Sequence, residues 1–448
     1  MFTRLFLWAI TSALAGFLFG FDTVVISGAE QKIQEVWSLD GTMHGRCTSA
    51  ALWGTVLGAV FGGIPTQRFG RRRTLIWIGL LYFVSAIGSG LATGPVFFMI
   101  ARLIGGVGVG IATVASPLYI SEIAPPNRRG QLAGLFQFNI VFGILIALVS
   151  NYVIGRFMDA DVAWRWMLGV EAIPALLYTL MCLTIPESPR WLISVVGDRE
   201  SGTTILRNIA PDLSDVQIQN LVDSISASED EPASGSRFFS SRLKIPIAMA
   251  FLVAFFNQMS GINAILYYAP RIFEWAGLGR NAALLQSVGI GVTNLIFTYV
   301  GLWLIDRAGR RTLLFMGSFG YIASLGLCAW AFHVQNFQLV PICIFAFIAA
   351  HAIGQGAVIW VLISEIFPGR YRAAGQAFGS STHWVFAALL TMYFPLMAEK
   401  FEPSLIFGFF CSMMVLQLAW VKFFVPETRG VPLEQMEAML TSQGKGMI

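Results

Sequence analysis

Twelve apolar stretches, each long enough to cross a membrane as a helix, follow one another along this chain of 448 residues. A transmembrane helix needs roughly 20 mostly apolar residues. Apolar residues make up 56% of the chain and charged residues only 12%, against about 45–50% and about 25% in soluble domains. We therefore predict an all-α membrane protein with spans at about 5–29, 46–66, 74–93, 95–121, 131–154, 165–185, 246–270, 283–305, 312–333, 338–364, 374–398 and 404–425.

The composition also excludes several other classes of protein. The 37 Phe and 13 Trp residues are too many for a disordered chain. The five cysteines are scattered without paired spacing, which argues against a disulfide scaffold and against a CxxC metal site. The net charge of +4 is small, so we expect no nucleic-acid partner. The first apolar run is too long for a cleaved signal peptide, and Asp22 lies where a cleavage region would be expected.

The distribution of Lys and Arg predicts the orientation in the membrane. Of the 29 Lys and Arg residues, 21 fall on the side of the predicted spans that holds both termini, seven fall on the other side, and Arg102 lies inside a span. Positive residues accumulate in cytoplasmic loops. We therefore expect both termini and the long central loop to face the cytoplasm.

The central loop, at about 187–245, is the longest polar stretch. Residues Asp215–Ser226 place apolar side chains on one helical face, and Ser226–Ser236 has the composition of a linker. We predict an N-terminal six-helix half at 1–193, a cytoplasmic linker with short amphipathic helices at 194–243, a C-terminal six-helix half at 244–430 and a cytoplasmic tail at 431–448.

The two halves repeat one another. "RFGRRRTL" begins at Arg68 and "RAGRRTL" at Arg307, which are 239 residues apart. Glu122 of "YISEIAPPNRRGQ" matches Glu365 of "LISEIFPGRYRAAGQ" at a separation of 243 residues, and "PESPR" and "PETRG" begin 240 residues apart. An even number of spans separates the copies, so the halves have the same orientation. Parallel six-helix repeats with a site between them are the architecture of many secondary transporters.

These motifs resemble the sugar porters of the major facilitator superfamily along essentially the whole chain. The resemblance rests on "GFLFGFDTVVISGA" (16–29), "GRRRTL" (70–75), "ARLIGGVGVGIATVASPLYISE" (101–122), "RGQLAGLFQ" (129–137), "PESPRWL" (186–192), "NQMSGINAILYYAP" (257–270), "DRAGRRTLL" (306–314), "WVLISEIFP" (360–368) and "PETRG" (426–430). Bacterial proton-coupled xylose and glucose symporters are the most similar branch, and facilitative glucose transporters are more distant.

The resemblance implies uptake of a monosaccharide together with protons by alternating access, in a bacterial inner membrane. It implies a transporter rather than an enzyme, with the sugar, protons and the lipid bilayer as partners, no cofactor and no metal, and function as a monomer. A facilitative uniporter on the same fold and a non-transporting sugar sensor are the alternatives. A sensor is expected to have a long cytoplasmic tail, whereas about 22 residues follow Val425.

Three charged residues lie deep inside predicted spans, away from the span ends: Asp22, Arg102 and Glu171. A lone charge in a bilayer is costly, so we expect Asp22 and Arg102 to pair. A purely structural ion pair is the alternative to a functional one. By resemblance these residues match the proton-coupling aspartate, its arginine partner and an accompanying glutamate of the xylose symporters, whereas facilitative glucose transporters carry Asn in place of Asp22. A coupling acid must favour the carboxylate beside Arg102 and the neutral acid away from it.

A sugar site needs side chains that hydrogen-bond hydroxyl groups and aromatic faces that cover C–H surfaces. A lone Asn or Gln in a span more often forms an interhelical hydrogen bond than a sugar contact, and a lone Trp more often serves in packing or as an interface anchor. The group of such residues is therefore stronger evidence for a sugar site than any one of them. We also expect local unwinding at Gly261 to expose backbone groups. The candidates are Phe19, Gln137, Asn257, Gln258, Asn263, Tyr267, Asn294, Trp360, His383 and Trp384.

Four positions depart from the pattern of the family. Asn257 replaces the first of two consecutive glutamines, and Ala387 stands where glucose facilitators often have a sugar-binding Asn. His383 replaces Asn or Gln, and His351 occupies a position that is often aromatic. For both histidines we favour packing or hydroxyl contacts over a second proton site.

Repeated Glu and Arg residues at the predicted cytoplasmic ends form a further set. The accumulation of positive residues on the cytoplasmic side is enough to explain the arginines, but it does not explain the repeated glutamates. We expect ion-pair latches that favour the outward-facing state and break when the cytoplasmic side opens. Because Gln67 stands where the second half has Asp306, the first latch should be weaker. The candidates are Arg68, Arg71, Glu122, Arg129, Glu187, Arg190, Asp306, Arg310, Arg311, Glu365, Arg372 and Glu427.

Overall fold

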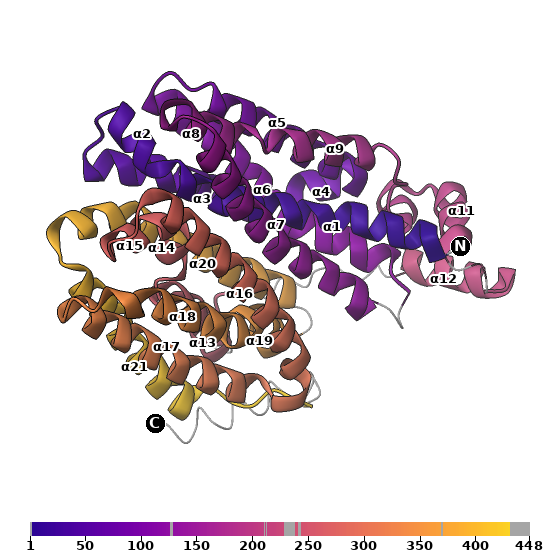
Figure 1. Ribbon diagram of the computed structural model, residues 1–448. Coiled ribbons are helices and arrows are strands. Elements are labelled where there is room, and N and C mark those ends of the chain that lie inside the picture. Colours follow the sequence, from indigo (N-terminus) through magenta and orange to yellow (C-terminus); the bar gives the residue numbers. More distant parts are fainter. Residues whose placement is uncertain are drawn as a thin grey trace.

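The computed structural model describes residues 2–125, 129–209, 211, 213–227, 238–240, 243–368 and 371–430, which form helices joined by short loops and contain no β-strand within these ranges. Figure 1 shows two groups of long helices, one from each half of the chain, that lean against each other. This is the all-α, two-half arrangement predicted from the repeat.

The N-terminal half contains the helices α1 (Phe2–Val25), η1 (Ile26–Gly28), α2 (Glu30–Val36), α3 (Gly41–Phe61), α4 (Gly63–Phe69), α5 (Arg71–Gly90), α6 (Pro95–Ile123), α7 (Arg129–Phe157), α8 (Ala160–Gly169) and α9 (Ala172–Cys182). The C-terminal half contains α13 (Lys244–Met259), α14 (Ile262–Tyr267), α15 (Ala269–Trp275), α16 (Arg280–Ala308), α17 (Arg310–His333), η5 (Phe337–Leu339), α18 (Val340–Ile353), α19 (Gln355–Ile366), α20 (Arg372–Lys400) and α21 (Pro403–Phe424).

A helix or a broken helix lies at each of the twelve predicted spans. Among the described residues, nine helices are long and apolar enough to cross a membrane, and the bent pair α3–α4 makes a tenth. The other two predicted spans correspond to α8–α9, which is interrupted at Val170 and Glu171, and to α20, whose first half carries several polar side chains.

The seventh predicted span is broken at Gly261. This residue has φ +87°, a left-handed conformation that separates α13 from α14. A Cβ atom at this position would lie 2.6 Å from the ring of Phe410, so both the backbone and the neighbouring ring favour glycine. The predicted unwinding beside Gly261 is confirmed.

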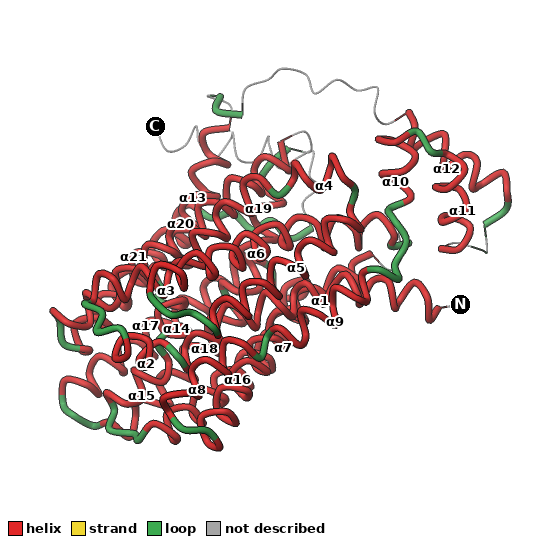
Figure 2. Tube along the Cα trace, turned by 90° about the horizontal axis from the view of Figure 1, so that it is seen from above, coloured by secondary structure: helices red, strands yellow, loops and turns green. Residues whose placement is uncertain are grey.

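The central loop folds into α10 (Pro189–Trp191), a short π-helical turn η3 (Leu192–Val196), α11 (Arg199–Ile209) and α12 (Asp215–Ala227). The last of these confirms the predicted helix at 215–226 to within one residue. A small apolar core joins these helices and consists of Ile193, Leu206, Ile218, Val222 and Ile225. Figure 2 shows α10, α11 and α12 grouped beside the bundle, at the end where the N-terminus lies.

The halves contact each other mainly through α3 with α20 and α7 with α16. We call the end of the bundle that holds α2 and α15 the far end, and the end that holds Arg71 and Arg310 the arginine-rich end. At the far end, a Cβ atom on Gly45 would lie 1.8 Å from the carbonyl oxygen of Met392, and one on Gly155 would lie 2.7 Å from Leu284. The halves are thus closely packed toward the far end (Figure 1).

Close packing within the N-terminal half also depends on glycine. A Cβ atom on Gly106 of α6 would lie 1.8 Å from the carbonyl oxygen of Ala51 on α3. We expect Gly106→Ala to destabilise the purified protein by about 1–3 kcal/mol, because the two backbones must move apart. Gly134→Ala in α7 is the matched control, since nothing lies within 4 Å of its Cβ position. Thermal unfolding in detergent measures both, and an unchanged Tm for Gly106→Ala would contradict the packing argument.

Candidate functional site

Asp22 and Arg102 form a buried ion pair between α1 and α6. The guanidinium donates from Nη1 to Asp22 Oδ1 at 2.5 Å and from Nη2 to the Asp22 carbonyl oxygen at 2.9 Å. Both side chains are 1% exposed. The predicted pairing of these two charges is therefore present in the structure.

Glu171 lies at the break between α8 and α9 and interacts electrostatically with both members of the pair. It is 1% exposed. Its Oε1 and the Asp22 Oδ2 receive no hydrogen bond from a described donor, and the two carboxyl groups lie within hydrogen-bonding reach of each other when one of them is protonated. The hydroxyl groups of Tyr82 and Ser85 on α5 are also buried without a described partner. The cluster thus holds two carboxyl groups and one guanidinium, with the two hydroxyl groups of Tyr82 and Ser85 nearby.

This composition suits a site that gains and loses one proton. When all three groups are ionised, the cluster has one net negative charge, and a single bound proton cancels it. Charges in a membrane interior are costly unless they are compensated. Two carboxyl groups that share one cationic partner are therefore a chemically sound proton-binding arrangement.

Gln258 of α13 is the centre of a second buried cluster, near the break at Gly261. Its amide nitrogen donates to Asn257 Oδ1 at 3.0 Å and lies 3.2 Å from the ring nitrogens of His383 on α20. Its amide oxygen accepts a hydrogen bond from Asn263 Nδ2 at 2.7 Å. Gln258 is fully buried, so residues from α13, α14 and α20 hold this amide in one orientation.

Aromatic rings surround the same cluster. The ring of His383 contacts those of Trp360 of α19 and Trp384, with centroid distances of 5.0 and 4.8 Å. Trp384 also packs edge-on against Phe19 of α1 at 5.5 Å, and its indole nitrogen is buried without a described partner. Phe19 belongs to the N-terminal half, so this contact joins the two halves beside the amide cluster.

Three other predicted sugar contacts lie outside this network of described contacts. Tyr267 of α14 is buried and lies within electrostatic range of Arg102 and Asp22. Within the described part of the chain, Asn294 of α16 accepts a long hydrogen bond of 3.4 Å from the Thr298 hydroxyl. Gln137 of α7 is half-buried, and no described hydrogen bond ties it to the Gln258 cluster.

His351, the other unusual histidine, belongs to the C-terminal half. Its Nδ1 lies 2.7 Å from the Tyr321 hydroxyl on α17. This contact supplies a partner for the imidazole inside the helix bundle. A packing and hydroxyl-contact role, as expected from the sequence, is consistent with this position.

At the arginine-rich end, Arg71 and Glu122 form a two-pronged pair within the N-terminal half, with N···O distances of 2.9 and 2.8 Å. Glu187 accepts hydrogen bonds from the backbone amides of Arg71, Arg72 and Ser188. Burial raises the pKa of the Glu187 carboxyl above its usual value, although these amides and Arg71 act in the opposite direction.

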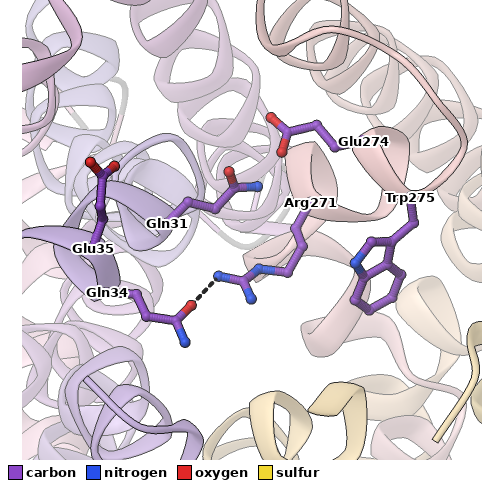
Figure 3. Close-up of a pocket in the computed structure, with 6 residues that line it drawn as sticks. All are labelled: Gln31, Gln34, Glu35, Arg271, Glu274 and Trp275. Atoms are coloured by element: carbon purple, nitrogen blue, oxygen red, sulfur yellow. Dashed lines mark hydrogen bonds between the residues drawn. The ribbon is translucent and has the colours of Figure 1, made fainter. Parts of the chain in front are cut away.

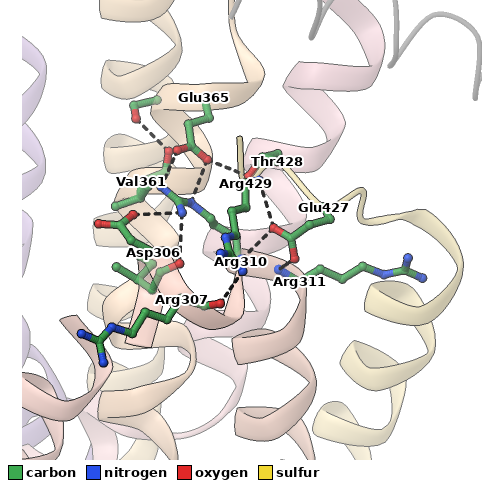
Figure 4. A network of polar contacts seen from close by, with 11 residues as sticks. Asp306, Arg307, Arg310, Arg311, Val361, Glu365, Glu427, Thr428 and Arg429 are labelled. Carbon is green, nitrogen blue, oxygen red and sulfur yellow. Dashed lines mark hydrogen bonds and ion pairs between the residues drawn. The ribbon is translucent and has the colours of Figure 1, made fainter. Parts of the chain in front are cut away.

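The C-terminal half repeats this arrangement (Figure 4). Arg310 donates to Glu365 at 3.1 and 2.8 Å, and Glu427 accepts from the backbone amides of Arg310 and Arg311. Arg310 also pairs with Asp306 at 3.1 Å. This extra contact has no counterpart at Gln67 in the first half.

The described ion pairs of this set hold each half together rather than join the halves. Arg71–Glu122 connects α5 to α6, and Arg310–Glu365 connects α17 to α19. Both pairs are formed in this structure, and the expectation that they favour the outward-facing state and break when the cytoplasmic side opens stays a prediction. Of the remaining members, Arg372 donates to the Ser364 carbonyl, Arg68 lies over the Phe69 ring, Arg190 is exposed, and the side chain of Arg129 lies outside the described part of the chain.

The sequence analysis missed a set of polar contacts that join the two halves at the far end. Glu30 of α2 pairs with Arg271 of α15. Nearby, the Tyr268 hydroxyl lies 2.6 Å from the Thr48 hydroxyl and donates to the Thr391 carbonyl at 3.0 Å. Glu30 directly follows the first apolar stretch and Arg271 directly follows the seventh, which is the one signal in the sequence that relates them.

A cavity of about 410 Å³ also lies at the far end, away from the buried clusters. Figure 3 shows Gln31, Gln34 and Glu35 of α2 facing Arg271, Glu274 and Trp275 of α15 across it. Because its two walls come from different halves, the cavity changes shape whenever the halves move at this end.

Comparison with known proteins places the chain among transporters. Residues 8–440 match the family model described as "Sugar (and other) transporter". The chain is 35% identical to the D-xylose-proton symporter of Escherichia coli K12, over 97% of this chain and 96% of the relative. It is 32% identical to the arabinose-proton symporter of Bacillus subtilis, over 96% and 93% of the two chains.

The fold agrees with solved structures of the E. coli xylose transporter. The inward-open conformation superposes with a TM-score of 0.87 at 33% identity and covers 97% of this chain and 99% of that one. The form of the proton:xylose symporter bound to 6-bromo-6-deoxy-D-glucose gives 0.80 at 34% identity, over 98% and 99% of the chains. Of these two comparisons, the inward-open form of that transporter gives the higher score.

Proposed function

The chain belongs to the sugar transporter family of the major facilitator superfamily, and from that premise we propose that it is a proton-coupled monosaccharide symporter. The buried Asp22–Arg102 pair with Glu171 beside it carries this proposal. A pure facilitator needs no titratable pair inside its helices, and an intramembrane ion pair is costly. The relatives named as proton symporters support the same assignment.

In the proposed cycle, Asp22 carries the proton and Arg102 promotes its release. The sugar binds at the Gln258 cluster, where amides contact hydroxyl groups and Trp360 and Trp384 cover the C–H faces. Phe19 touches Trp384 from the other half, so closure of the halves around a sugar and a change at α1 are mechanically linked. Tyr267, on the broken span of the sugar cluster, lies within electrostatic reach of the ion pair.

Transport into proteoliposomes tests the proposal directly. We expect a hexose or pentose resembling glucose or xylose to accumulate when the outside is more acidic than the lumen. Accumulation should cease when a protonophore dissipates the gradient. A protein that equilibrates sugar but ignores the gradient would be a uniporter, and one that binds sugar without moving it would be a sensor.

We further propose that the arginine-rich end faces the cytoplasm of a bacterial cell, in the inner membrane. In a background without native cysteines, Thr42→Cys at the far end should react with an impermeant maleimide in intact spheroplasts. Ser201→Cys, exposed on α11 at the arginine-rich end, should react only after the membrane is opened. Labelling of Ser201→Cys in intact spheroplasts would reverse the orientation.

A further inference from the structure

The contact between Glu30 and Arg271 joins the two halves of the transporter at the far end. The guanidinium donates from Nε to Glu30 Oε1 at 3.0 Å and from Nη2 to Glu30 Oε2 at 2.7 Å. The residues are 241 positions apart in the sequence. The Glu30 side chain is fully buried, and that of Arg271 is 18% exposed.

Neighbouring groups complete the polar environment of this pair. Gln34 Oε1 accepts a further hydrogen bond from Arg271 Nη2 at 2.7 Å, as Figure 3 shows. His44 Nε2 of α3 lies 2.9 Å from Glu30 Oε2. Arg271 thus reaches from the wall of the far-end cavity inward to a carboxylate that is enclosed by α2, α3 and α15.

Arg271 of the other half contributes to the enclosed environment of Glu30. Burial raises the pKa of Glu30, but Arg271 and His44 together lower it below the usual value, so the carboxylate remains ionised in this conformation. When the halves separate at this end, Arg271 moves away and the carboxylate must be solvated instead. Removing one partner of a buried ion pair strongly destabilises the conformation that buries the other partner.

We propose that Glu30 and Arg271 form an ionic gate that holds the far end closed, and that they set the equilibrium between far-end-closed and far-end-open conformations. The gate rests on the proposed function, because alternating access requires the halves to separate at this end. It is separate from the Asp22–Arg102 pair, which lies wholly within the N-terminal half. Asp22–Arg102 would couple the cycle to protons, and Glu30–Arg271 would bias it.

Distance measurements between spin labels test the gate without relying on sugar transport. Thr42 at the start of α3 and Asn281 at the start of α16 are exposed and belong to different halves, so labelled cysteines there report on far-end opening. In a background free of native cysteines, we expect Glu30→Gln and Arg271→Gln each to raise the open-to-closed ratio at least about 10-fold.

The double variant with Glu30→Gln and Arg271→Gln should shift the ratio less than the product of the two single effects, because it leaves no unpaired charge. A paired control is Lys32→Gln and Asp161→Asn, since these residues form a 2.8 Å ion pair near the same end but within one half. The control should leave the ratio unchanged.

Arg271→Lys keeps the positive charge and serves as a control for misfolding. It should shift the open-to-closed ratio less than Arg271→Gln. Unchanged distance distributions in monodisperse Glu30→Gln and Arg271→Gln protein would overturn the gate. The gate would also be overturned if the double variant shifted the open-to-closed ratio by the full product of the two single effects. Because the readout is a distance in the sugar-free protein, a failure of proton coupling would leave this test intact.

Discussion

Asp22→Asn abolishes sugar accumulation driven by a pH gradient, whereas exchange of labelled sugar across the membrane continues. The expected effect is large, since one pH unit stores about 1.4 kcal/mol per proton, enough for about tenfold accumulation at one proton per sugar. Asn is nearly isosteric and retains a hydrogen-bonding group beside Arg102. The amide cannot titrate, so the sugar ratio across the membrane should fall to about 1.

Proteoliposomes loaded with sugar and then given an inward proton gradient provide the measurement, with counterflow on the same preparation as the internal control. Asp159→Asn is a matched control, because Asp159 is an exposed acid at the start of α8. Arg102→Ala should also impair coupling. Undiminished accumulation in Asp22→Asn would place the coupling site elsewhere, and the Asp22–Arg102 pair would then be structural.

Gln258→Ala weakens sugar binding about 5- to 150-fold while the protein remains folded. The side chain is fully buried and exchanges hydrogen bonds with Asn257, Asn263 and His383. Loss of one hydrogen-bonding side chain from a buried polar site costs about 1–3 kcal/mol, which corresponds to this range of affinity. Equilibrium binding of sugar to purified protein measures the effect.

Gln417→Ala separates a loss of sugar contact from a general loss of packing. Gln417 is an equally buried glutamine of the same half, and it donates to the Ser318 hydroxyl between α17 and α21, outside the described hydrogen bonds of the Gln258 cluster. We expect a lower Tm but unchanged sugar affinity for this control. Normal affinity in both Gln258→Ala and Trp360→Ala would show that the sugar binds elsewhere.

Much of the fold could be predicted from hydropathy and repetition. The twelve spans follow because a bilayer requires about 20 apolar residues per helix, and helices occupy all twelve positions. The break at Gly261 was also predictable, since only glycine readily adopts φ +87° inside a helical run. The break at Glu171 was not expected, because the surrounding residues read as one continuous apolar run.

The candidate sites were predicted unevenly. Asp22 and Arg102 were easy to pair, because two opposite charges inside apolar spans have few other ways to be stabilised. The joint position of Gln258, His383 and the two tryptophans depends on how α13, α19 and α20 pack, and the sequence identified the candidates without their contacts. For Gln137 and Asn294, the polar residue types suggested a shared cluster that the described contacts do not include.

The sequence by itself determined which segments cross the membrane, that the chain consists of two similar halves, and which charges needed partners. These are local properties, since hydropathy, helix length and the cost of a buried charge depend on neighbours along the chain. Only the tertiary structure decided that Arg71 and Arg310 bind glutamates of their own half, and that Glu30 meets Arg271 across 241 residues. Those pairings depend on the angle and depth at which helices from distant segments pack, and side-chain identity alone does not specify either quantity.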